Sequence, residues 1–382
     1  MPDPRFKQLA HLLVTHSCAL KKGDKILIEA TEIPDAFLSV LTDEILEAGA
    51  LPVVDRKDER LNRILLKSGT EEQWAERLRL QADIELHRMK QMDAYLGLRG
   101  SHNITELSDI PPERMKMHAD ILFKPVHVEQ RVKRTRWCVL RWPTPSMAQQ
   151  AGVSTEAFED FYFKVCSADY AAMSEAVKPL KELMNKTDRV RITAKDTDLQ
   201  FSIKGIDSIP CTGEMNIPDG ECFTAPVRDS VNGQIQFNSS TIYRGTPFDD
   251  IKLVFKDGKV VDFECSDNEA LGAILDSDEG ARYIGEFALG FHPFIAKPMR
   301  DILFDEKIRG SLHLALGQAY EEADNGNRSS VHWDLVLLQE PGGEIYFDDV
   351  LIRKDGKFVL PELEALNPEA LSGTPRRVMV GH

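Results

Sequence analysis

The chain has 382 residues, 42% hydrophobic and 29% charged, which is typical of a globular protein with two or three domains. Its net charge of −15 argues against nucleic-acid binding, because neutralising phosphates requires clustered Lys and Arg. No apolar run approaches the roughly 18–20 residues of a membrane helix, and the N-terminus lacks the layout of a secretory signal, so we expect a cytoplasmic protein with no nucleic-acid or membrane partner.

The first half of the chain alternates strand and helix patterns. Apolar strands are predicted at 24–30 and 51–56, with an amphipathic helix over 33–50 between them. This βαβ unit predicts a mainly parallel sheet. Because the first strand is followed by TEIPDA and not by GxGxxG, we do not expect a dinucleotide site. Further helices are expected at 71–89, 113–131 and 155–186, and further strands at 93–100 and 137–145.

The second half has the alternating rhythm of β-strands. The stretch 189–205 alternates apolar and polar residues as a hairpin does, and a second hairpin is predicted around the DG turn of 251–265. Further strands are expected at 240–245, 310–317, 329–338 and 343–359, with one helix over 268–284. We therefore expect the following parts: an α/β N-terminal domain over 1–183, a β-rich α+β C-terminal domain over 188–371, and a loosely held tail over 372–382.

Four short segments of the second half place a carboxylate or an imidazole beside an apolar run. In SSVHWDLVLL (329–338), strand alternation puts His332 and Asp334 on one face. Each segment alone is explained as well by a loop carboxylate or by a hydrogen-bonded core histidine. The candidate residues are Glu221 in NIPDGECFTAP, Glu286 in IGEFALG, His313 in GSLHLALGQAY, and His332 with Asp334.

Together these residues offer the ligands that two divalent ions need. Carboxylate oxygen and imidazole nitrogen suit zinc, cobalt or manganese, whereas the six scattered cysteines form no CxxC and predict no thiolate site. Two such ions about 3.5–4 Å apart can share a water and stabilise a tetrahedral intermediate. Spacing alone leaves an ordinary buried polar cluster as an alternative, because the residues are far apart in sequence and no HExxH is present.

The motifs NIPDGECFTAP, GEFALG, GSLHLALGQAY and NRSSVHWD resemble, in order and approximate separation, those of the aminopeptidase T, aminopeptidase S and PepS family of metallopeptidases. The resemblance extends over roughly residues 10–365. It implies a cytosolic, homodimeric exopeptidase that removes N-terminal amino acids from peptides at a two-metal centre in the C-terminal domain. The implied metal ligands are Glu221, Glu286, His313, His332 and Asp334, with Glu286 or Asp334 bridging the ions.

The resemblance also implies two catalytic roles. Glu286 is expected to hold the attacking water and to accept its proton. Tyr320, seven residues after His313, is expected to stabilise the oxyanion through its hydroxyl. A substrate with a free N-terminal amine fits the acidic balance of the chain.

Two alternatives stay open. Ring-cleaving dioxygenases acting on dihydroxypyridine share this fold family, and His313, His332 and Asp334 could hold their non-haem Fe(II). Such a site would leave Glu221 and Glu286 without a role, which favours the peptidase. The third reading is a metal- or peptide-binding homologue that has lost catalysis.

Overall fold

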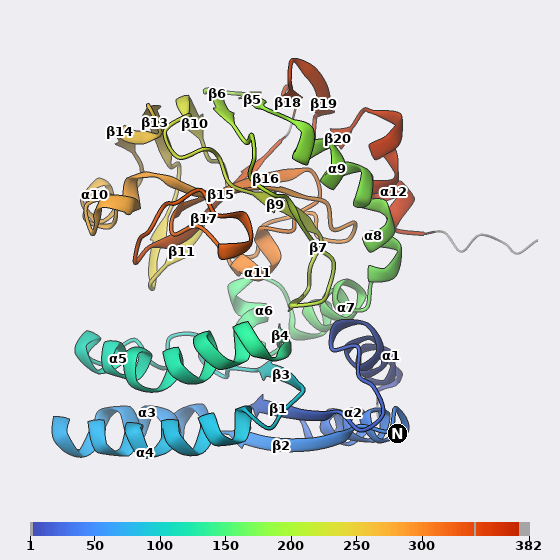
Figure 1. Cartoon of the computed structure of the whole chain (residues 1–382), viewed down its shortest axis with the longest axis vertical. Helices are drawn as coiled ribbons and strands as arrows, with labels where there is room; N and C mark the ends of the chain where they lie inside the picture. Colours follow the sequence, from blue (N-terminus) through green and yellow to red (C-terminus); the bar gives the residue numbers. More distant parts are fainter. Residues whose placement is uncertain (1–2, 340, 374–382) are drawn as a thin grey trace, which may run out of the picture. The chain divides into compact units, whose positions relative to one another are not determined.

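The computed structural model describes residues 3–339 and 341–373, so most of the tail predicted at 372–382 lies outside the described residues. The chain forms two compact units (Figure 1). Unit 1 comprises Met1–Ser167 and Gly213–Ile217, and unit 2 comprises Ala168–Thr212 and Pro218–His382. Within the described part of the chain, no helix combines the length and the apolar character that crossing a bilayer requires.

Unit 1 is built on a parallel sheet with the strand order β2-β1-β3-β4-β8. The predicted strand–helix–strand unit is present as β1, α2 and β2, which confirms the α/β class of this half. The strands are β1 (Lys25–Thr31), β2 (Leu51–Lys57), β3 (Ala94–Arg99), β4 (Arg136–Arg141) and β8 (Asn216–Ile217).

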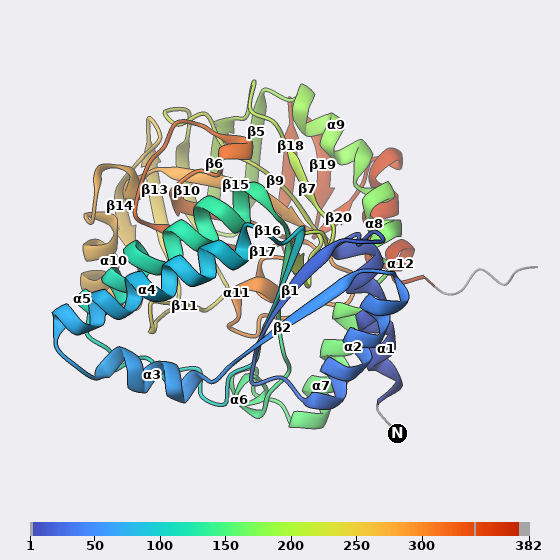
Figure 2. The same cartoon turned by 60° about the horizontal axis from the view of Figure 1, so that its bottom comes forward.

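Helices cover both faces of this sheet, with α2 on one face and α4 on the other (Figure 2). Helix α4 begins with a capping box between Thr70 and Gln73 and packs against η2. The helices are α1 (Pro4–Leu12), η1 (Leu13–Ser17), α2 (Asp35–Glu47), α3 (Glu59–Lys67), α4 (Glu71–Met89), α5 (Pro112–His118), η2 (Ala119–Val132), α6 (Pro145–Gln150) and α7 (Thr155–Cys166). The sequence analysis did not predict α1 or α3; in α3 only Leu66 is buried, so the core-facing signal is weak.

The helical stretch predicted over 155–186 is divided into α7, α8 (Tyr170–Ala176) and α9 (Lys178–Lys186). Asp169 caps α8 by accepting a hydrogen bond from the backbone N–H of Ala172, and Pro179 lies in the first turn of α9. Helix α9 packs against β7 and β9, and both α8 and α9 pack against η5. For this reason the chain passes into unit 2 after Ser167 and not in the predicted interval 183–188.

Unit 2 contains two antiparallel sheets and a separate hairpin, as expected for a β-rich α+β domain. The first, here called the β5–β20 sheet, has the order β14-β13-β10-β6-β5-β18-β19-β20. The second, here called the β7–β17 sheet, has the order β17-β16-β15-β9-β7. Its strands are β7 (Ile209–Cys211), β9 (Glu221–Thr224), β15 (Ile284–Gly290), β16 (Ser311–Gly317) and β17 (His332–Leu338).

The remaining elements of unit 2 complete the two layers. The strands of the β5–β20 sheet are β5 (Arg189–Ala194), β6 (Thr197–Ser202), β10 (Asn232–Gln236), β13 (Lys252–Lys256), β14 (Lys259–Glu264), β18 (Glu344–Phe347), β19 (Val350–Lys354) and β20 (Lys357–Phe358). The separate hairpin is β11 (Thr241–Tyr243) with β12 (Thr246–Phe248). The short helices, besides α8 and α9, are α10 (Asn268–Leu275), η3 (Glu279–Arg282), α11 (Ile302–Asp305), η4 (Glu321–Ala323), η5 (Pro361–Leu366) and α12 (Pro368–Leu371).

One face of the β7–β17 sheet is core. Phe287 of β15 meets Phe201 of β6 with ring centroids 5.0 Å apart, which joins the two sheets. Trp333 of β17 stacks on Tyr243 at 4.7 Å and contacts Phe248 at 4.9 Å, so the hairpin covers this end of the strand. The residues between these core positions therefore point to the other face of the sheet.

The first prediction concerns Asp278, which joins η3 to the segment that leads into β17. Its carboxylate accepts hydrogen bonds from the hydroxyl of Ser329 at 2.7 Å and from the amide of Ser330 at 2.7 Å. Partial burial would raise the pKa of Asp278, but these hydrogen bonds outweigh it and hold the pKa at about 2. We expect Asp278→Asn to lower the free energy of unfolding at pH 7 by about 1–3 kcal/mol in urea denaturation.

The sign of the pH dependence follows from this lowered pKa. The stabilisation by Asp278 is complete above the unfolded-state pKa of about 3.9 and is lost as the pH falls toward 2. The stability gap between wild type and Asp278→Asn should therefore close below about pH 4. Glu279→Gln, at a neighbouring side chain that is 93% exposed, is the matched control and should change little. An equal gap at pH 7 and pH 3 would contradict this assignment.

Candidate metal centre

The five predicted ligands all lie on one face of the β7–β17 sheet. Paired residues on neighbouring antiparallel strands share a face, as do alternate residues along one strand. The register that brings the ligands together consists of the pairs Glu221↔Gly290, Glu286↔Ala315, His313↔Ala288, Asp334↔Ala315 and His332↔Gly317. The sequence prediction that His332 and Asp334 point to the same face is thus met by the strand register.

Small residues separate the ligands on this face. On at least one side, each ligand pairs with Ala288, Ala315, Gly290 or Gly317, whose side chains are a methyl group or a hydrogen. On their other sides, His313 pairs with Val336 and Glu221 with Cys211. Large neighbours at these positions would fill the space above the sheet. Alternation of a large polar ligand with a small partner therefore allows the carboxylates and imidazoles to converge.

A bulge aims Glu286 into this space. The pairing of β15 with β16 shifts by one residue between Ile284 and Glu286, so Gly285 has no partner of its own. A Cβ atom at Gly285 would lie 2.4 Å from the carbonyl oxygen of Gly317, which only a glycine avoids. The sequence GEF thus encodes both the bulge and the carboxylate that follows it.

The ligands form two groups that share one carboxylate. Glu286 Oε1 lies 3.4 Å from His313 Nε2, and Glu286 Oε2 lies 3.5 Å from His332 Nε2. Glu221 completes the first group, with Oε2 3.7 Å from His313 Nε2. Asp334 completes the second, with Oδ1 3.4 Å from His332 Nε2. Within each group, one ligand atom per residue lies within 4.8 Å of the others.

Three further charged residues lie at this centre, and the sequence analysis did not identify them. Lys307 Nζ lies 2.5 Å from Glu221 Oε1, 2.7 Å from Glu306 Oε1 and 3.5 Å from Asp219 Oδ1. Glu306 also forms a metal-capable group with His313 and Asp334. Asp219 and Glu306 stand outside the strands, next to β9 and α11, so no strand periodicity marked them. The PDG turn before Glu221 was the available signal for Asp219.

Negative charge dominates the centre. Burial alone would lower the pKa of His313 and His332, but Glu221 beside His313 and Asp334 beside His332 raise both to about 10. Burial likewise would lower the pKa of Lys307, yet Glu221, Glu306 and Asp219 raise it, so its ammonium stays charged. Without metal, protons on the imidazoles therefore offset the excess of carboxylates.

Tyr320 lies beside this cluster, at the start of η4. Its ring is 4.8 Å from the ring of His332 and 5.6 Å from that of Phe223. Although 45% of its surface is exposed, burial of its hydroxyl, together with the charges of Glu286 and Asp334, raises the pKa of Tyr320. The hydroxyl therefore stays protonated and can donate a hydrogen bond.

The donor atoms fit divalent metal ions. Among the described residues, Glu221 Oε2 and Asp334 Oδ1 are buried without a hydrogen-bond partner, which is costly unless a ligand satisfies them. His332 Nδ1 lies 2.9 Å from the carbonyl oxygen of Gln318, so Nδ1 carries the proton and Nε2 is left to bind metal. A mixed set of carboxylates and imidazoles suits zinc and other first-row divalent ions.

The second prediction tests the charge balance through Lys307. Lys307→Met leaves the carboxylates of Glu221, Glu306 and Asp219 buried without their ammonium partner. We expect a loss of about 3–5 kcal/mol in the unfolding free energy of the metal-free protein, because breaking a buried ion pair exposes the desolvation cost of its partner.

Divalent metal should restore part of this stability, since it supplies the missing positive charge. The measurement is thermal unfolding with and without Zn²⁺. Lys204→Met removes an ammonium that is 75% exposed and paired with Asp188, so it serves as the control. Equal stability of metal-free wild type and Lys307→Met would contradict the charge argument.

Comparisons with known proteins identify the family of the chain. The family model described as thermophilic metalloprotease (M29) matches residues 3–357. Aminopeptidase 2 of Geobacillus stearothermophilus is 27% identical, with 93% of this chain and 95% of that protein covered. Aminopeptidase PepS of Streptococcus thermophilus is 25% identical, with 87% and 93% covered.

Two solved structures share the fold. Wild-type AmpT from Thermus thermophilus superposes with a TM-score of 0.79 at 24% identity, covering 93% of this chain and 99% of that one. The 2,5-dihydroxypyridine dioxygenase from Pseudomonas putida KT2440 has a TM-score of 0.61 at 13% identity, covering 95% and 100%. The resemblance stated from the sequence motifs is thereby confirmed, as is the enzyme class. The chain belongs to the thermophilic metalloprotease family, M29, and is a hydrolase of the metalloaminopeptidase class.

Proposed function

We propose that this enzyme releases N-terminal amino acids from peptides, using water activated by two divalent metal ions that share Glu286. The observation that carries the proposal is the position of Glu286 between two ligand groups, with one oxygen directed at each imidazole. Glu221 and His313 would complete one metal site, and His332 and Asp334 the other. Both bridging candidates from the sequence lie near the two imidazoles, since Asp334 also forms a group with His313 and Glu306. We favour Glu286, because its two oxygens lie 3.4 Å from His313 Nε2 and 3.5 Å from His332 Nε2.

Two ions bound there would lower the pKa of a water molecule to near neutrality and neutralise charge on the oxyanion. The protein's own groups act around this reaction. The hydroxyl of Tyr320 donates a hydrogen bond toward the developing oxyanion. Carboxylates beside the ligands attract the free amine of the substrate, which restricts hydrolysis to the first peptide bond.

The proton of the attacking water needs a carboxylate that is not occupied as a bridge. The sequence analysis gave this role to Glu286, whose two oxygens both face imidazoles in the structure. Glu306 supports the role better: its Oε1 is held by Lys307, while the side chain stays next to His313 and Asp334. We therefore assign proton transfer to Glu306 and leave bridging to Glu286.

The dioxygenase alternative rests on fold likeness and on three residues, His313, His332 and Asp334. It gives no role to Glu221 or to Glu286, which lies at the middle of the cluster. The preference for zinc, cobalt or manganese stays a prediction. The homodimer, the cytoplasmic location and the lack of nucleic-acid or membrane partners likewise stay predictions.

The third prediction is metal dependence. Chelation should abolish hydrolysis of aminoacyl p-nitroanilides and dipeptides, and Zn²⁺, Co²⁺ or Mn²⁺ should restore it. N-acetylated versions of the same peptides are the control and should resist cleavage, because they lack the free amine. If no divalent ion restores hydrolysis, while Fe(II) with oxygen consumes 2,5-dihydroxypyridine, the peptidase mechanism proposed for this site is wrong.

The fourth prediction separates the bridge from the proton acceptor. Glu286→Gln should reduce the number of bound ions, because the bridging carboxylate loses one anionic oxygen. Glu306→Gln should keep the metal content of wild type and lower kcat by about 10²–10⁴-fold. The measurements are bound metal per chain and steady-state kinetics on the same samples. Full activity in Glu306→Gln would show that another group accepts the proton.

A further inference from the structure

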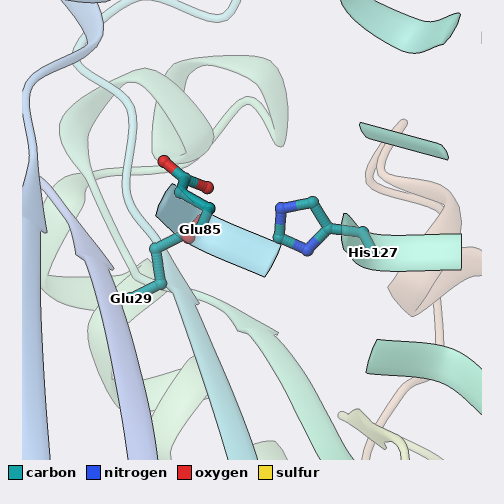
Figure 3. A group of neighbouring side chains, drawn as sticks. All are labelled: Glu29, Glu85 and His127. Carbon is teal, nitrogen blue, oxygen red and sulfur yellow. The ribbon is translucent and has the colours of Figure 1, made fainter. Parts of the chain in front are cut away.

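A second group of metal-capable side chains lies in unit 1. It consists of Glu29 on β1, Glu85 on α4 and His127 on η2. One ligand atom of each residue lies within 4.8 Å of the others. Figure 3 shows the imidazole of His127 directed at the carboxylate of Glu85. Three elements that are distant in the sequence thus converge on one point beside the parallel sheet.

The imidazole of His127 is buried without a hydrogen-bond partner for one nitrogen. Only 8% of the residue is exposed, and Nδ1 has no hydrogen-bond partner among the described residues. Its ring lies against the rings of Tyr95 and Phe123, with centroids 5.9 Å and 5.1 Å away. Burial and the charge of Arg131 lower the pKa of His127 to about 3, so the ring is neutral and one nitrogen can bind a cation.

The carboxylates are held by groups that can yield to a metal ion. Glu85 Oε1 lies 3.1 Å from Lys57 Nζ and accepts a hydrogen bond from Gln81 Nε2 at 3.0 Å. Lys57 is shared with Asp55, whose Oδ2 lies 3.0 Å from the same ammonium. An ion bound to Glu85 could displace Lys57 toward Asp55 without leaving the ammonium unpaired. Burial also raises the pKa of Glu29, so this carboxylate would gain from a cation beside it.

A cavity borders one member of the group, Glu85. A cavity of about 350 Å³ is lined by Lys57, Gln81 and Glu85, together with other residues of β2 and α4. This volume exceeds the space of a hydrated ion, since one water occupies about 30 Å³ in the liquid. Glu85 thus lines the cavity and also belongs to the group with His127.

We propose that Glu29, Glu85 and His127 form a divalent-cation site in unit 1, with zinc the best match to two carboxylates and one imidazole. Ligand atoms around a tetrahedral zinc lie about 3.4 Å apart, so the three side chains would close by rotamer changes. A water from the cavity would supply the fourth ligand. The bound ion would join β1, α4 and η2, and so would stabilise unit 1 by linkage.

The test counts metal on the full-length protein. Metal-free wild type and His127→Ala are titrated with Zn²⁺, and bound metal per chain is measured after removal of free ion. The same pair is compared in a His313→Ala, His332→Ala background, which lacks the imidazoles of the unit 2 centre. We expect His127→Ala to bind one ion fewer in both backgrounds. His102→Ala, at an imidazole of unit 1 that is 60% exposed, is the matched control and should keep the wild-type count. An unchanged count in a folded His127→Ala overturns the proposal.

A second variant decides the question if His127→Ala does not fold. Lys57→Met removes the ammonium that competes for Glu85 and leaves an unbranched side chain one atom shorter, at a position that is 31% exposed. We expect Zn²⁺ to bind unit 1 of this variant at least tenfold more tightly in the background without the unit 2 imidazoles. Co²⁺ gives an independent readout, since its visible absorption reports the nitrogen ligand. Unchanged or weaker binding in Lys57→Met overturns the proposal.

Discussion

The concentration of negative charge on one face of the β7–β17 sheet is the constraint on which the site depends. Glu221, Glu286 and Asp334 are placed there by strand register, and Asp219 and Glu306 join them from adjacent segments. Lys307 is in ion-pair contact with three carboxylates of this cluster, those of Glu221, Glu306 and Asp219. Such a cluster is tolerated in a folded protein only with protons or cations to balance it. Divalent ions meet that need, and the same ions supply the chemistry of peptide hydrolysis.

The residues that pack the core and the residues of the candidate metal site lie on opposite faces of the β7–β17 sheet. The core face of the sheet carries Phe287 and Trp333, which pack against the second sheet and the β11–β12 hairpin. The other face carries the ligands with alanine and glycine between them, and Phe223 and Val336 lie on this face as well. Because strand alternation assigns successive residues to opposite faces, the core residues fix where the ligands stand. A one-residue slip of β17 would move His332 and Asp334 into the core, so the register itself protects the site.

Sequence reasoning predicted the features that follow a periodic pattern or a recognisable motif. The period of two placed His332 and Asp334 on one face, and the βαβ pattern predicted the parallel sheet of unit 1. Sequence reasoning could not identify Glu306 and Lys307 as members of the site. Both residues follow the short helix α11, and their place in the site depends on contacts with distant strands. The predicted helix over 268–284 ends at Leu275, because the chain turns into η3 before β15. The unit boundary also required tertiary contacts, since α8 and α9 read as a continuation of α7.

Two of the solved structures that share this fold carry the names of different enzymes. One is named as an aminopeptidase T and the other as a dioxygenase, yet both cover nearly the whole chain. Fold therefore does not decide the reaction. The carboxylate between the two imidazoles is the feature that distinguishes a two-metal centre from a site for one iron. Anomalous diffraction from crystals of the zinc-loaded protein tests it most directly. The account predicts two peaks about 3.5–4 Å apart, with Glu286 between them. A single peak bound by His313, His332 and Asp334, with Glu286 uncoordinated, would contradict it.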